Sequence, residues 1–126
     1  MLKVKNDTIM INRGDIGTLG ISIPNGDANY IFKIGDVVRF SIIEAKNYSN
    51  IIKQIDVIVE EETEEVDINL LPEHTKIGDV INSKVDYYYE VELNPDTAPQ
   101  TIIGHDDKGA KLFVLYPEGE KNNDQS

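Results

Sequence analysis

Apolar and polar residues alternate along much of this chain, which is the pattern of a strand with one buried face. The longest such run is Lys84–Leu93, where Val85, Tyr87 and Tyr89 alternate with charged or hydroxylated residues. Further strand-forming segments are Thr8–Asn12, Gly17–Ile23, Val37–Ile43, Ile51–Glu60, Glu65–Leu70, Gln100–His105 and Ala110–Tyr116. The pattern predicts about seven or eight short strands.

Turn-forming residues separate these segments. Arg13, Gly14 and Asp15 lie between the first two strands and predict a hairpin with Gly14 at its turn, and Gly35 and Asp36 predict a turn before Val37. Asp106–Gly109 predicts the tight turn of a last hairpin. A single helical turn is expected over Leu71–Ile77, with a proline near its start and a glycine after it.

The predicted fold is an all-β, antiparallel β-sandwich with one short helical turn. A chain of 126 residues matches one hydrophobic core, so we expect a single domain over residues 1–117, followed by a polar tail over 118–126. No internal repeat is visible.

Acidic residues dominate the charge. The chain has 23 Asp and Glu against 12 Lys and Arg, a formal net charge of -11, which repels phosphate backbones and anionic lipid surfaces. We therefore expect neither nucleic acid nor membrane as a partner. The segment Glu60–Glu65 is too charged for a core and predicts a solvated hairpin loop, so Glu61, Glu62, Glu64 and Glu65 form a candidate interaction surface.

Residues for catalysis or cofactor binding are scarce. There is no cysteine, which excludes disulfides, thiolate metal ligands and a cysteine nucleophile. The two histidines, His74 and His105, are expected on the solvated surface, and neither lies in a nucleophile-elbow motif. Asp106, Asp107 and the acidic run lack the spacing of a calcium loop, and no phosphate-binding glycine loop is present. We expect no catalytic residue, no metal and no cofactor.

Tyr88 is the aromatic residue that the alternation places outside. Its neighbours Tyr87 and Tyr89 fall on the buried face, which leaves Tyr88 as a candidate contact for a protein or a sugar. Carbohydrate-cleaving clefts use aromatic platforms, and a chain with no Trp and 3 Phe offers little for one. Hydrolysis of glycosides is therefore not expected.

The order of these motifs resembles a known family. TIMINRGDIGTLGISI from Thr8, YIFKIGDVVRF from Tyr30, INLLPEHTK from Ile68, YYYEVELN from Tyr87 and QTIIG from Gln100 follow one another as in the N-terminal domain of siphophage upper baseplate proteins and related prophage tail proteins. The resemblance covers Thr8 to Tyr116. It implies an immunoglobulin-like sandwich in which Gly14, Asp15, Gly35 and Asp36 are structural turn residues.

The same resemblance implies a non-enzymatic role in a particle. Domains of this kind anchor a component to the tail tip, and the residues after Tyr116 are too few for a stalk or a receptor-binding head. We expect a structural component of a phage tail or baseplate, or of a tail-like bacteriocin, made in the bacterial cytoplasm and located in the virion. Its partners would be other tail proteins and further copies of itself. A freestanding carbohydrate-binding or adhesion module and a capsid decoration protein are the alternatives.

Overall fold

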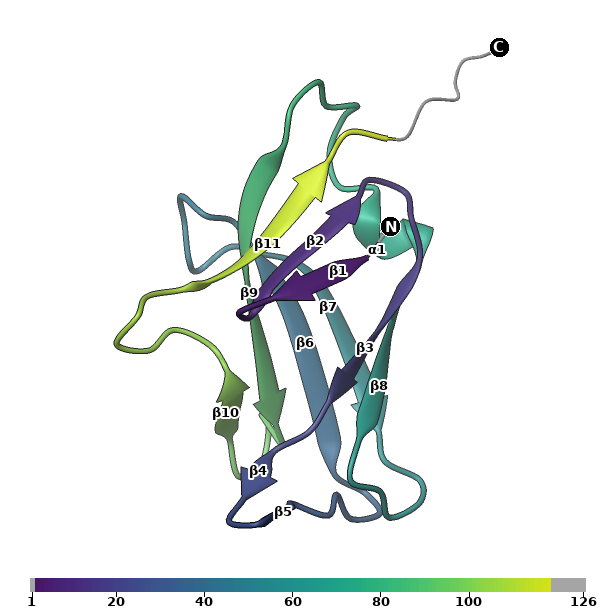
Figure 1. The fold of residues 1–126 in the computed structure, drawn as a ribbon, viewed down its shortest axis with the longest axis vertical. Helices are drawn as coiled ribbons and strands as arrows, with labels where there is room; N and C mark the ends of the chain where they lie inside the picture. The colour runs from purple at the N-terminus through teal and green to yellow at the C-terminus, as the bar shows by residue number, and fades with distance from the viewer. Residues whose placement is uncertain (1, 119–126) are drawn as a thin grey trace.

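Most strands of the molecule join in one large sheet. In the computed structural model, which describes residues 2–118, seven strands belong to this sheet (Figure 1). Its order is β1 (Lys3–Lys5), β2 (Thr8–Asn12), β11 (Lys111–Tyr116), β9 (Val85–Leu93), β6 (Val37–Ile43) and β7 (Ile51–Ile58), and β10 (Gln100–Ile103) also pairs with β9. The prediction of an all-β chain is confirmed.

A small sheet packs over the large one. It consists of β3 (Gly17–Ile21) and β8 (Val66–Leu70), which are antiparallel, with Leu19 opposite Ile68. A two-residue hairpin of β4 (Pro24–Asn25) and β5 (Ala28–Asn29) follows β3, and the predicted helical turn is α1 (Pro72–Thr75). No helix within residues 2–118 has the length and apolar content to cross a membrane.

The core lies between the two sheets, where the alternating residues meet. Phe40 of β6 contacts Tyr89 of β9 and Phe113 of β11, with ring centroids 5.7 and 6.3 Å apart. Ile68 and Leu70 close the core from the small sheet, and both are fully buried. Burial of these side chains is the main source of stability in a chain without disulfides.

Two predicted hairpins are wrong because the chain changes sheet at both turns. The Arg13–Asp15 turn leads from β2 in the large sheet to β3 in the small one. The acidic run Glu60–Glu65 likewise leads from β7 in the large sheet to β8 in the small one. Alternation predicts which face of a strand is buried, but it does not specify the neighbouring strand.

The last predicted hairpin is also wrong. β10 and β11 do not pair with each other, since β11 pairs with Val85–Tyr89 of β9 and β10 pairs with Val91–Leu93. The turn at Asp106–Gly109 keeps only one isolated bridge, between its first and last residues. The two strands therefore follow one another along the same side of β9.

The strand count and the strand directions also differ from the prediction. Residues 2–118 contain eleven strands, whereas the sequence pattern indicates about seven or eight. The additional strands β1, β4 and β5 are too short to show an alternation. β11 runs parallel to β2, with Phe113 opposite Ile9, so the sheet is mostly but not wholly antiparallel. β11 therefore fills the position between β2 and β9.

Candidate functional site

The acidic run is a surface loop that is attached to the core at Thr63. Phe32, which is fully buried, exchanges two backbone hydrogen bonds with Thr63 at 2.8 and 3.3 Å. The Thr63 hydroxyl also donates to the carbonyl oxygen of Glu65 at 2.9 Å. The predicted surface residues Glu61, Glu62, Glu64 and Glu65 are all exposed around this anchor, as is Glu60. Their charges are thus displayed at one fixed place.

Exposed apolar side chains lie beside these carboxylates. The backbone N–H of Gly35 donates to the carbonyl oxygen of Val59 at 2.9 Å, so the chain next to Ile34 meets the end of β7, and Ile58 lines a hollow together with Glu60, Glu61, Glu62 and Glu65. Ile34 is 72% exposed and Ile58 is 63% exposed. We call the surface formed by Ile34, Ile58 and Glu60–Glu65 the acidic end. It combines apolar area with negative charge, as a surface that meets a basic partner would.

The turn at Gly35 and Asp36 supports this end of the molecule. Gly35 has φ of +94°, a conformation that favours glycine. One oxygen of the Asp36 carboxylate accepts from the Tyr30 hydroxyl at 2.8 Å and from the Lys33 N–H at 2.9 Å, and the other accepts from the Asn94 amide at 3.1 Å. Burial alone would raise the pKa of Asp36, but these hydrogen bonds outweigh it and lower that pKa. The turn is therefore held by an ionised carboxylate.

The Arg13–Gly14–Asp15 turn is a structural junction. Its hydrogen bond runs from the Asp15 N–H to the Asn12 carbonyl oxygen at 3.0 Å, and Gly14 has φ of +88°. The Thr75 hydroxyl accepts from the Gly14 N–H at 3.1 Å and donates to the Asp15 carbonyl at 2.8 Å. The turn is thereby tied to helix α1.

The Arg13 side chain points inward. Only 9% of it is exposed, and it donates to the carbonyl oxygens of Ile77 at 3.3 Å and Gly78 at 2.6 Å and to Glu118 at 2.7 Å. A receptor that reads an Arg-Gly-Asp sequence needs the arginine in solvent, so this tripeptide is not displayed. Of the predicted tail, Glu118 is thus in contact with the domain, and residues 119–126 lie outside the described part.

Tyr88 lies on the outer face of the large sheet, as the alternation predicts, beside Leu112 and Ile43 on the neighbouring strands. Its ring is 5.8 Å from that of Tyr48, which also meets His105 edge-on at 6.2 Å. Burial, followed by a hydrogen bond to Glu90, raises the pKa of Tyr48. Tyr88 is therefore one member of a small aromatic cluster, formed by Tyr48, Tyr88 and His105.

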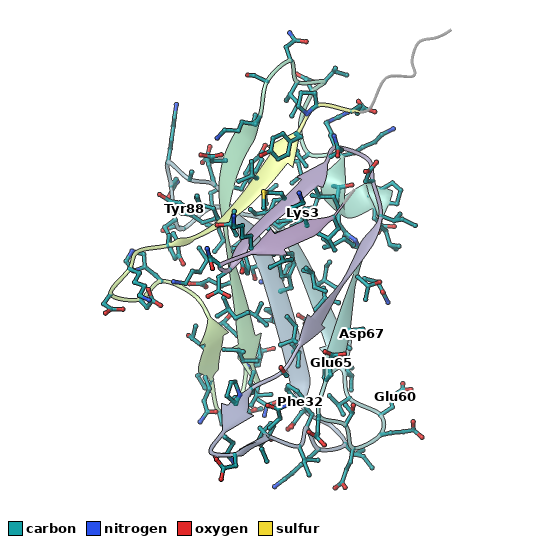
Figure 2. The ribbon with its side chains drawn as sticks, viewed as in Figure 1. Lys3, Phe32, Glu60, Glu65, Asp67 and Tyr88 are labelled. Carbon is teal, nitrogen blue, oxygen red and sulfur yellow. The ribbon has the colours of Figure 1, made fainter. Side chains whose placement is uncertain are left out.

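The predicted interaction residues do not form one surface. Figure 2 shows Tyr88 on one side of the molecule and Glu60 and Glu65 near the opposite end. The sequence pointed to neither Tyr48 nor His105 as a neighbour of Tyr88, because both come from loops that strand periodicity does not describe. The aromatic cluster and the acidic end are two separate candidates.

The two histidines differ in exposure and in their partners. His105 is exposed, as predicted, but the prediction for His74 is wrong, because its side chain is only 16% exposed. Its Nδ1 accepts from the Leu71 N–H at 2.9 Å and caps helix α1. No three His, Cys, Asp or Glu side chains in the described range are grouped as metal ligands.

Arg39 forms the main ion-pair group that the sequence did not indicate. It lies on the outer face of β6 and binds Asp56 at 2.7 Å and Asp96 at 3.0 Å. Hydrogen bonds to Asp56 and Asp96 raise the pKa of the guanidinium group, and the bond from Arg39 lowers the pKa of Asp56. Each of the three charged groups has its partner within this cluster. The cluster therefore links β6 to β7 and to the loop that follows β9.

Comparison of the chain with known protein families, with curated proteins and with solved structures found no match in any of the three.

Proposed function

We propose that this protein is a non-enzymatic structural component of a phage tail or baseplate, or of a tail-like bacteriocin. In this proposal it is located in the virion, docks against other tail proteins and associates with further copies of itself within the particle. The tail assignment is supported by the order of the motifs from Thr8 to Tyr116. We further propose that its two stacked sheets are a variant of the immunoglobulin-like sandwich.

The acidic end is the observation that carries the docking role. Its glutamates are exposed around a backbone anchor at Thr63, and Ile34 and Ile58 add apolar area beside them. Pre-ordered contacts lower the entropy cost of association, and complementary charge directs the approach of a partner. A basic surface with an apolar centre is the expected counterpart.

The location is tested by electron microscopy of induced particles labelled with an antibody against the purified protein. Gold label at the tail tip or baseplate supports the proposal. Label on heads indicates a capsid decoration protein instead, and absence from purified particles contradicts a structural role.

The docking surface is tested with a charge-reversed variant. We expect Glu61→Lys, Glu62→Lys and Glu64→Lys together to leave the fold intact and to reduce incorporation into particles, because these side chains are exposed. The matched control reverses Glu73, Asp79 and Asp107, which are exposed outside the acidic end. Equal incorporation of both variants would remove the acidic end from consideration.

The aromatic cluster favours a second candidate function, a freestanding carbohydrate-binding or adhesion module. Aromatic side chains at a surface can stack on sugar rings, and Tyr48 is 38% exposed beside Tyr88. A glycan array with the wild-type protein and Tyr88→Ala distinguishes the two functions. Binding that is lost in the variant supports the sugar-binding role, and an array without binding excludes it for the glycans presented.

A further inference from the structure

The small sheet has an unpaired edge. β3 pairs with β8 on one side, and within residues 2–118 no strand pairs with its other side. Every second residue of such an edge strand directs its backbone N–H and C=O away from the sheet, where they can pair with another strand. The large sheet extends beyond β3 on this side, because β1 and β2 have no counterpart in the small sheet (Figure 1).

A hollow with an apolar lining follows this edge. Its apolar side chains come from both sheets and are Val4, Ile9, Leu19, Ile21, Val91 and Ile103. Val4 and Ile9 are directly opposite on β1 and β2, yet Val4 is 53% exposed while Ile9 is 2% exposed. Leu2 lies against Gly17 at the start of β3. Thr18 and Gly20 of β3 are exposed, while Leu19 and Ile21 are buried.

Negative charge lies over the same edge. A Cβ atom on Gly20 would stand 2.7 Å from the Glu65 carboxylate, so this side chain lies across β3. Asp67 is opposite Gly20 in the ladder, and Asp7 lines the hollow. A strand added beside β3 would run about 4.8 Å away, within reach of Glu65 for a lysine or arginine side chain.

We infer that the free edge of β3 receives an extended segment of another polypeptide whose residues alternate between apolar and basic. Its apolar side chains would enter the hollow, and its basic side chains would face Glu65. A second copy of this chain fits less well, because antiparallel pairing of two β3 edges would bring two Glu65 carboxylates together on chains that each carry a net charge of -11. The inference rests on the proposed docking function and names the chemistry of one partner segment.

Synthetic peptides test this inference on the intact protein. The probe is an eight-residue peptide of alternating lysine and valine, compared with a peptide of four lysines followed by four valines and with alternating glutamate and valine. We expect the alternating basic peptide to bind at least about tenfold more tightly than the block peptide, measured by fluorescence anisotropy, and the acidic peptide not to bind. Equal binding of the two basic peptides would overturn the inference, since charge alone would then explain it.

Amide hydrogen exchange locates the bound peptide. We expect slower exchange within Gly17–Ile21 when the alternating peptide is present, because its backbone would pair with the outward-facing N–H groups of β3. Protection confined to β7 or to β8, which are also edge strands, would instead place the peptide elsewhere and overturn the inference.

Substitutions by uncharged residues test whether the peptide binds at the hollow or elsewhere on the surface. Val4→Asn should weaken binding by about tenfold, while Ile51→Asn, at a similarly exposed apolar residue of β7 outside the acidic end, should leave it unchanged. Glu65→Gln should weaken binding by about threefold, without altering the core. Unchanged binding in both Val4→Asn and Glu65→Gln would refute the inference. Particle incorporation of the wild-type protein is a separate readout, so failure of peptide binding leaves the docking role standing.

Discussion

The guanidinium group of Arg13 donates a 2.6 Å hydrogen bond to the carbonyl oxygen of Gly78, 65 residues further along the chain. The same side chain also binds the carbonyl of Ile77 and the carboxylate of Glu118. We predict that Arg13→Ala lowers the free energy of unfolding by about 2–4 kcal/mol, because buried acceptors lose their donor. Urea denaturation of the wild type and the variant measures the difference.

Arg39 provides the control for this prediction. Its partners Asp56 and Asp96 are 42% and 76% exposed, so solvent screens their attraction. Arg39→Ala should therefore cost at most about 1 kcal/mol in the same experiment. An equal loss in the two arginine variants would contradict the view that Arg13 is a structural junction.

Substitution of Gly14 should cost stability because of the backbone conformation that this residue adopts, and not because space is lacking. A Cβ atom there would meet Lys76 at 3.4 Å, an ordinary contact distance, but φ of +88° disfavours any side chain. We predict that Gly14→Ala costs about 1–2 kcal/mol, measured by thermal unfolding, and that Gly14→Asn costs less because asparagine tolerates this region better. If alanine and asparagine had the same effect, backbone strain would not be the cause.

Asp36 should make stability depend on pH. Its pKa in the folded protein lies below the ordinary value of 3.8, so ionised Asp36 stabilises the fold above that value, and this contribution is lost as the pH falls through the lowered pKa. We predict that Asp36→Asn costs about 1–2 kcal/mol at pH 7, because one acceptor oxygen is lost. The difference between variant and wild type should shrink below about pH 4. Urea unfolding at several pH values tests this, with Asp27→Asn at an exposed turn as control; a constant difference down to pH 2 would be contrary to the prediction.

Truncation of Phe40 should cost much more stability than truncation of the exposed Ile34. It is fully buried between Tyr89 and Phe113, so Phe40→Ala should lower the free energy of unfolding by about 3–5 kcal/mol. Ile34→Ala, at a residue 72% exposed, should change it by no more than about 0.5 kcal/mol. Similar losses at the two positions, measured by denaturant unfolding, would argue against the core assignment.

The alternation of residues predicted the buried face of the strands but not their partners. In β9, Tyr89, Val91 and Leu93 are buried as their spacing indicates. The partner of β2 is β11, and Asn12 binds Pro117 across 105 residues of sequence. Periodicity is a local property, whereas pairing depends on which distant strand completes the core, so the hairpin interpretations failed where the chain changes sheet.

The sequence likewise predicted only part of the candidate surfaces. The exposure of Glu61 and the outward position of Tyr88 follow from charge and alternation. The anchor at Thr63 depends on Phe32, and the aromatic cluster depends on Tyr48, whose loop has no periodic pattern. Contacts of this kind require the three-dimensional arrangement, because no local signal in the sequence encodes them.

The position of β11 between β2 and β9 has a consequence for biosynthesis. While a ribosome is still adding the residues that precede Lys111, the central place of the large sheet is empty, and β2 and the Val85–Tyr89 part of β9 both have unpaired edges. Nascent chains should therefore stay incompletely folded until β11 has left the exit tunnel, and they should expose strands that other nascent chains can bind. Chaperone dependence during synthesis would then be greatest before β11 becomes available to fill this position.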